Sequence, residues 1–366
     1  MDSFREFATN LNHFNKTLGE LHAIGVQHDV QLPELVLLGD QSAGKSSLMS
    51  GLAGFNLPRS DGVCTRCVTH IRVSPHAEWS CRVSLRKAYA YEMPLSDSPD
   101  NITASNPFPS WTPMPQEIQD FKTIQDPAEI EEVLKWAQIA ILNPDSPAAH
   151  YIPGSGHVAT QPNGLQNATH SIEASGIKFS PNVIALEIKG PDYPELSFYD
   201  LPGVFAAPAT QRDAYTKDIV INLAISYIQH ESAILIWAVP MNSDPHNSHM
   251  LDLIRKENAL ERTVGVITKA DLFQSTSVSS RAKWLKVLKN EEFRVGLGYY
   301  VTSRLERDTV EEQDRWEKMF FMNETCYSNS SVLSWPPEGF QEFALRCGVE
   351  RLKMEVSDRI GKAFKD

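Results

Sequence analysis

The sequence lacks a long apolar run, an excess of basic residues and a dense set of cysteines. No stretch approaches the roughly 20 apolar residues that a membrane-spanning helix requires, and no signal-peptide pattern is present. We therefore expect a cytoplasmic location, with any peripheral attachment to membranes coming from other parts of the full-length protein.

The charge balance has the wrong sign for nucleic acid or anionic lipid. The chain carries 34 Lys and Arg against 46 Asp and Glu, a formal net charge of −12 at pH 7, and phosphate-rich polymers repel such a surface. The five cysteines are scattered and odd in number, which favours reduced thiols. Cys64 and Cys67 form a lone C-x-x-C without a second pair, which argues against zinc. We therefore expect no nucleic-acid partner, and 366 residues suffice for one large core or two modest ones.

A phosphate-binding pattern is present in residues 37–48, which read LLGDQSAGKSSL. Gly39, four residues and then Gly44-Lys45-Ser46 fit G-x-x-x-x-G-K-[ST]. In this pattern backbone N–H groups surround phosphate oxygens, the lysine meets the β- and γ-phosphates, and the serine hydroxyl binds Mg²⁺. The preceding ELVLL predicts a buried strand and the following SLMSGLAG a short helix, which is the context that the pattern needs.

A second strand end supplies an acid for the metal. The segment ELSFYDLPGVF, residues 195–205, predicts a strand that ends at Asp200. P-loop enzymes place an acid for Mg²⁺ at the end of a neighbouring strand, and Gly203 follows at a spacing that lets a backbone N–H face the γ-phosphate. SAILIWAVP, residues 232–240, predicts a core strand without a motif of its own.

A third strand end selects the base. RTVGVITKAD, residues 262–271, predicts a strand that ends in Thr268-Lys269-Ala270-Asp271. The Asp271 carboxylate would accept hydrogen bonds from guanine N1–H and N2–H₂ and would repel the acceptor N1 of adenine. Lys269 can lie along the purine face. The three motifs in this order predict a guanine nucleotide; a P-loop ATPase is the alternative that nucleotide competition would test.

The residue that orients the attacking water has to come from an unusual place. Small regulatory GTPases use a Gln directly after the D-x-x-G motif, but this chain has Val204 there. Gln41, inside the phosphate loop, can reach the far side of the γ-phosphate. The alternative is that Gln41 only points into solvent.

These residues together resemble a known family. GDQSAGKSS, then LPRSDGVCTRC, DLPG and TKAD are similar to the GTPase domain of the dynamin superfamily, closest to the Mx and fungal dynamin-like branch. The resemblance extends to FSPNVIALEIKGPDYPELSFYDLPG, AVPMNSDPHNSHMLDLI and PPEGFQEFALRCGVERLKMEVSDRI. It implies that the nucleotide contacts Gln41, Ser42, Ala43, Gly44, Lys45, Ser46, Ser47, Arg59, Ser60, Asp200, Gly203, Thr268, Lys269, Asp271, Thr302, Ser303 and Arg304.

The resemblance also implies a mechanism. The catalytic residues would be Gln41, Ser42, Lys45 and Thr65, with Mg²⁺ bound by Ser46 and Thr65 and, through water, by Asp200. K⁺ or Na⁺, held partly by Ser42, would compensate charge, and a homodimer across the nucleotide would stimulate hydrolysis. Ser60 and Asp61 depart from the family pattern, and Asp61 adds a negative charge beside the site.

The expected fold is α/β, a P-loop GTPase with a mixed, mostly parallel central sheet flanked by helices. We expect a loop over Ser96–Pro115, a helix over AEIEEVLKWAQIAIL and a mobile insert at about 143–181. Apolar stripes predict a helix at 1–28 and another at 341–366 on either side of the GTPase domain at 29–340. The two would pair as terminal helices of a bundle signalling element; the alternative is that each packs separately on the core.

The predicted function is GTP binding and hydrolysis, serving membrane remodelling or a related assembly in the full-length protein. A membrane or other target would be reached only through downstream domains. The alternative is a GTP-gated assembly module with negligible hydrolysis.

Overall fold

The computed structural model of the chain describes residues 34–54, 66–92, 102–103, 106–175, 177, 179–191, 193, 196–204, 211–273, 278–305, 309–322, 335 and 339–363. The predicted helix at 1–28 and the switch residues Arg59, Ser60, Asp61 and Thr65 lie outside the described residues.

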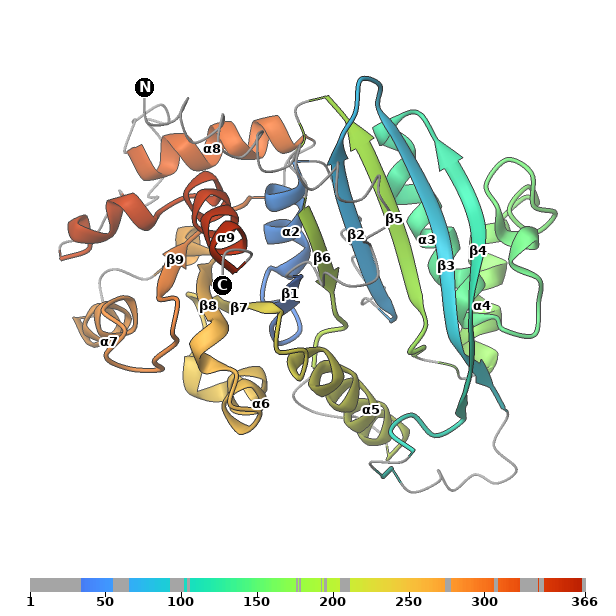
Figure 1. The fold of residues 1–366 in the computed structure, drawn as a ribbon, viewed down its shortest axis with the longest axis horizontal. Coiled ribbons are helices and arrows are strands. Elements are labelled where there is room, and N and C mark those ends of the chain that lie inside the picture. The colour runs from blue at the N-terminus through green and yellow to red at the C-terminus, as the bar shows by residue number, and fades with distance from the viewer. Residues whose placement is uncertain are drawn as a thin grey trace.

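Within this part of the chain the strands form a nine-stranded sheet in the order β4-β3-β5-β2-β6-β1-β7-β8-β9 (Figure 1). Five of the eight neighbouring pairs are parallel and three are antiparallel, which confirms the mixed, mostly parallel sheet. The strands are β1 (Leu35–Leu38), β2 (Val68–Pro75), β3 (Ser80–Tyr91), β4 (Trp111–Ile124), β5 (Val183–Gly190), β6 (Leu196–Asp200), β7 (Ile234–Pro240), β8 (Thr263–Thr268) and β9 (Tyr299–Val301).

The central strands are apolar because both of their faces are covered. All residues of β1 and β8 are buried, and β7 is buried except for its last residue. Parallel strands that carry helices on both faces read as continuous apolar runs. Three of the four runs predicted as strands are these three, and the fourth, which ends at Asp200, is β6. Their carboxyl ends therefore meet at one edge of the sheet.

The helices lie on both sides of this sheet. The predicted helix after Asp126 is α3, whose buried side includes Ile130, Val133, Leu134 and Ala137 at helical spacing. It packs with α4 behind β3, β4 and β5, while α2 contacts α8 and α9 near β1 (Figure 1). The helices are α2 (Lys45–Ala53), α3 (Ile130–Leu142), α4 (Gly164–Ser175), α5 (Gln211–Ile228), α6 (His249–Lys256), α7 (Val278–Leu288), α8 (Val310–Met322) and α9 (Val349–Ala363).

The predicted loop over Ser96–Pro115 is wrong at its end, because β4 begins at Trp111. Its Pro113 pairs with Tyr89 of β3. A proline cannot donate to a ladder, but β4 is an edge strand that needs partners on one side only. The edge position explains why a strand tolerates the proline spacing that predicted a loop.

The segment predicted as a mobile insert, 143–181, contains α4 and a 3₁₀ helix at Ala148–Tyr151. Tyr151 is buried, and its ring centroid lies 6.5 Å from that of Trp136 on α3. The segment therefore packs on α3, while its mobility stays a prediction.

The C-terminal helix begins later than predicted. Residues Gln341–Arg346 form a 3₁₀ helix, and α9 starts at Val349 after Gly348, whose φ is +92°. Leu345, expected in the apolar stripe, is 73% exposed because it precedes this break. The helix contacts α2 and β9, and its pairing with the predicted helix at 1–28 stays a prediction. None of the described helices combines the length and apolar composition of a membrane span.

Candidate nucleotide-binding and catalytic site

The phosphate loop starts where β1 leaves the sheet. A Cβ at Gly39 would lie 2.8 Å from the carbonyl oxygen of Ala238 on β7, so only glycine fits this close approach. Ser42 and Gly44 both have positive φ, 61° and 86°, and they turn the loop back so that α2 begins at Lys45. The predicted strand, loop and helix are therefore present in the predicted order.

Lys45 lies across this loop. Its ammonium Nζ donates to the carbonyl oxygens of Gly39, at 2.9 Å, and Asp40, at 3.1 Å. The side chain is 9% exposed. A buried cation and the N-terminus of α2 converge on the same loop, and both favour an anion such as a phosphate.

The segment after β6 closes against the phosphate loop. Parallel pairing places Leu37 beside Asp200, and the backbone N–H of Gln41 donates to the carbonyl oxygen of Val204 at 3.1 Å. A Cβ at Gly203 would lie 2.7 Å from Lys45 Nζ. The D-x-x-G glycine is therefore in contact with the lysine that the sequence assigned to the phosphates.

Val204 and Gln41 face different surroundings. Val204 is 1% exposed, so its side chain belongs to the core. Gln41 and Ser42 are exposed on the loop. This arrangement is compatible with a water-orienting role for Gln41, which stays a prediction.

The residues predicted to bind Mg²⁺ and described by the structure are Ser46 and Asp200. Ser46 is in the first turn of α2, and Asp200 is 7% exposed at the carboxyl end of β6. A hydroxyl and a carboxylate are hard oxygen donors, which Mg²⁺ prefers. The donor set at this edge of the sheet therefore fits the metal.

The loop predicted to recognise the base is hydrogen-bonded to the predicted phosphate loop. The hydroxyl of Thr268, at the end of β8, donates to the carbonyl oxygen of Ala43 at 2.6 Å. Lys269 then adopts a left-handed conformation with φ 56°. Thr268 is 4% exposed, so its buried side chain fixes the loop after β8 against the loop after β1.

Asp271 is held by the loop that follows β9. The hydroxyl of Ser303 donates to Asp271 Oδ1 at 2.5 Å, and the N–H of Asp271 donates to the same hydroxyl at 3.3 Å. The N–H of Ala270 donates to the carbonyl oxygen of Thr302 at 3.3 Å. Thr302 and Ser303 are 1% and 0% exposed, so the structure gives both a supporting contact beneath the predicted base-binding residues.

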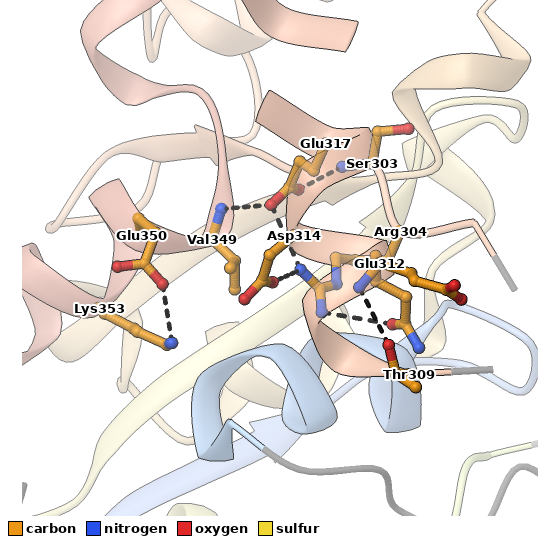
Figure 2. A network of polar contacts seen from close by, with 10 residues as sticks. Ser303, Arg304, Thr309, Glu312, Asp314, Glu317, Val349, Glu350 and Lys353 are labelled. Atoms are coloured by element: carbon orange, nitrogen blue, oxygen red, sulfur yellow. Dashed lines mark hydrogen bonds and ion pairs between the residues drawn. The ribbon is translucent and has the colours of Figure 1, made fainter. Parts of the chain in front are cut away.

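Arg304, also predicted to contact the nucleotide, turns into α8. Its guanidinium forms an ion pair with Asp314 and a second with Glu317 at 3.6 Å (Figure 2). It also donates a hydrogen bond to Gln313 at 3.3 Å. The side chain is 3% exposed. Any nucleotide contact made by Arg304 would therefore have to come from its backbone.

No pattern in the sequence pointed to the polar residues under this loop. Gln313, Asp314 and Glu317 belong to VEEQDRWEKMFFM, which reads as a solvated helix because polar residues surround its few apolar ones. Only the tertiary fold shows that two of them, Gln313 and Glu317, are 0% and 3% exposed.

A phosphate loop at the end of β1, an acid at the end of β6 and a base-recognition loop at the end of β8 share one edge of a mixed sheet. This combination of fold and site defines a P-loop GTPase domain. Residues 35–144 and 156–270 match the family model described as Dynamin family. The chain belongs to the dynamin family.

Several relatives of this chain carry Mx names, in line with the resemblance. Interferon-induced GTP-binding protein Mx2 of Canis lupus familiaris is 26% identical over 353 residues, which cover 94% of this chain and 39% of that protein. Mx1 of Mus musculus is 25% identical over 348 residues, with 94% and 44% covered. MxA of Danio rerio is 24% identical over 358 residues, with 95% and 44% covered. The chain thus spans about two fifths of the length of these relatives.

Proposed function

We propose that this chain binds GTP with Mg²⁺ and hydrolyses it to GDP and phosphate. The observation that carries the proposal is the meeting of three loops: Lys45 lies against Gly203, and Thr268 bonds the carbonyl oxygen of Ala43. Phosphate and base ends of one nucleotide could then be held at once. The names of these relatives, which call them GTP-binding proteins, support guanine as the base.

In this proposal Lys45 and the first N–H groups of α2 bind the phosphates, and Asp271 accepts from guanine. Ser46 and Asp200 hold Mg²⁺, which would neutralise charge on the β- and γ-phosphates. Gln41 orients the attacking water and Thr65 assists it. Ser42 helps to bind K⁺ or Na⁺.

We further propose that two GTPase domains face each other across the nucleotide during hydrolysis. Charge developing between the β- and γ-phosphates requires a cation. Arg304 is not available for that role because α8 buries and pairs its guanidinium. A monovalent ion in a loop ordered by the partner would supply the charge, and membrane remodelling or related assembly would be the task of the full-length protein.

A binding-versus-turnover comparison tests the enzymatic proposal. Lys45→Ala should abolish useful GTP binding, because Lys45 meets the ground-state phosphates. Gln41→Ala should leave the Kd for GTP largely unchanged and lower kcat by about 100-fold, because Gln41 acts on the water in the transition state. Fluorescent-nucleotide titration and phosphate release measure the two quantities.

Gln161→Ala is the control, since Gln161 is an exposed glutamine in the 143–181 segment. It should match the wild type in both measurements. Wild-type turnover by Gln41→Ala would refute the catalytic assignment, and negligible turnover by the wild type with intact GTP binding would favour the GTP-gated assembly module.

A further inference from the structure

Glu317 of α8 is a carboxylate inside the protein. It is 3% exposed, and its two oxygens serve different segments. Oε1 accepts from the backbone N–H of Ser303 at 2.8 Å, and Oε2 accepts from the backbone N–H of Val349 at 2.9 Å (Figure 2). One side chain thus connects the loop after β9 with the first residue of α9.

Burying a carboxylate is costly, so its contacts have to offset the lost hydration. Burial raises the pKa of Glu317, while the N–H groups of Val349 and Ser303 and the nearby Arg304 oppose that shift. One backbone donor belongs to the loop residue Ser303 and the other to Val349, the first residue of α9, whose N–H has no acceptor within the helix. An unpaired buried N–H would itself be destabilising. The carboxylate is therefore the acceptor around which these two segments are arranged.

The contacts of Glu317 lead to the base-recognition carboxylate. The backbone N–H of Ser303 donates to Glu317, and the hydroxyl of the same serine donates to Asp271 Oδ1 at 2.5 Å. Ser303 is 0% exposed, so its hydroxyl cannot exchange the bond to Asp271 for a bond to solvent. Glu317, Ser303 and Asp271 form one continuous chain of hydrogen bonds.

Arg304, the ion-pair partner of Glu317, also contacts α2, the helix that follows the predicted phosphate loop. Arg304, paired with Glu317, lies so close to Gly51 of α2 that a Cβ there would come within 3.2 Å of its guanidinium carbon. The loop after β9 is therefore held by Glu317 of α8 on one side and contacts α2 through Arg304 on the other.

We propose that Glu317 is a positioning residue for guanine recognition: it fixes Ser303, and through Ser303 the orientation of the Asp271 carboxylate. This inference rests on the proposed role of Asp271 in binding guanine. Glu317 touches no nucleotide; it sets how well both oxygens of Asp271 can accept from the base.

The ratio of GTP to ITP affinity tests the proposal, because inosine lacks the 2-amino group. ITP offers Asp271 one donor where GTP offers two, so the ratio reports how well the second hydrogen bond is aligned. In Glu317→Gln the amide oxygen can accept from only one of the two backbone N–H groups, and the NH₂ group opposes the other. The GTP:ITP ratio should fall at least about threefold from the wild-type value.

Glu312→Gln is the matched control, since it makes the same charge change at an exposed position of the same helix; its ratio should equal that of the wild type. Glu317→Asp keeps the charge but withdraws the oxygens, and its ratio should also fall. Circular dichroism and Tm report folding of each variant.

Equal weakening of GTP and ITP, with the ratio preserved, would overturn the proposal and leave Glu317 a purely structural residue. Failure of both Glu317 variants to fold would overturn it in the same way. A wild type that binds GTP no better than ITP would instead contradict the proposed function of Asp271, whatever the variants do.

Discussion

At the scale of single residues, His70 on β2 is a titratable group enclosed by the fold. It is 6% exposed, and its ring stacks on Tyr199 with centroids 4.3 Å apart. Its Nδ1 lies 2.9 Å from the Arg86 guanidinium and its Nε2 lies 2.8 Å from the Ser197 hydroxyl. Because arginine only donates, Nδ1 accepts and the ring is neutral, with its proton on Nε2.

Stability should therefore depend on pH through His70. Burial, with Arg86 and Arg72 nearby, lowers the pKa of His70 to about 3, whereas the unfolded chain binds the proton near 6.5. The unfolded state holds more protons below that value, so stability is lost as pH falls. Between pH 7 and pH 5 the free energy of unfolding should drop by about 2 kcal/mol from this group.

Urea unfolding of wild type and His70→Gln at the two pH values measures this contribution. Glutamine can accept from Arg86 and donate to Ser197 without titrating, so the variant should lose less stability on acidification. An identical pH dependence in both proteins would exclude His70 as its source.

At the scale of elements, the contact between the loop after β6 and the phosphate loop is the tightest part of the site. Gly203→Ala would put a Cβ 2.7 Å from Lys45 Nζ and 3.1 Å from the Cα of Gln41. The lysine would have to move, and we expect GTP binding to weaken by about tenfold, or about 1.4 kcal/mol, by fluorescent-nucleotide titration.

Gly54→Ala is its control. Gly54 has φ +80° and open space around the missing Cβ, so the variant should lose roughly 1 kcal/mol of stability through backbone strain and keep its GTP affinity. Unchanged GTP affinity in Gly203→Ala would contradict the expected cost of this contact.

The elements that the sequence predicted well are those in which pattern and burial agree. β1, β7 and β8 are continuous apolar runs, and the motifs at the ends of β1 and β8 follow from chemistry that needs fixed spacing. β4 was partly missed because prolines at an edge strand look like a loop. Glu317 was missed because the burial of a polar helix residue depends on which loops pack against it. The spacing of apolar residues along a helix does not report those contacts.

At the scale of the whole molecule, the proposed dimer makes the rate of GTP hydrolysis depend on the association of two chains. Specific GTPase activity should rise with protein concentration, and GDP with aluminium fluoride should produce dimers in sedimentation or light-scattering measurements. The free chain carries a formal net charge of −12, so self-association should strengthen as salt screens the repulsion. Activity per molecule that stays flat from dilute to concentrated protein would contradict the dimer.

The monovalent cation is tested in the same assay. Replacing K⁺ and Na⁺ by a bulky organic cation at constant ionic strength should slow turnover and leave the Kd for GTP unchanged, because the ion acts on charge that develops in the transition state. Turnover indifferent to the cation would remove the proposed ion, and Asp61 would then be the first residue to examine.

Guanine recognition by Asp271 is the central claim, and equilibrium competition between nucleotides tests it most directly. The wild type should bind GTP far more tightly than ATP. Asp271→Asn should lose two hydrogen bonds to a charged acceptor, on the order of 3 kcal/mol or about a hundredfold in GTP affinity, and should gain affinity for XTP, whose C2 carbonyl accepts from the new amide. Equal affinity of the wild type for ATP and GTP would contradict the account.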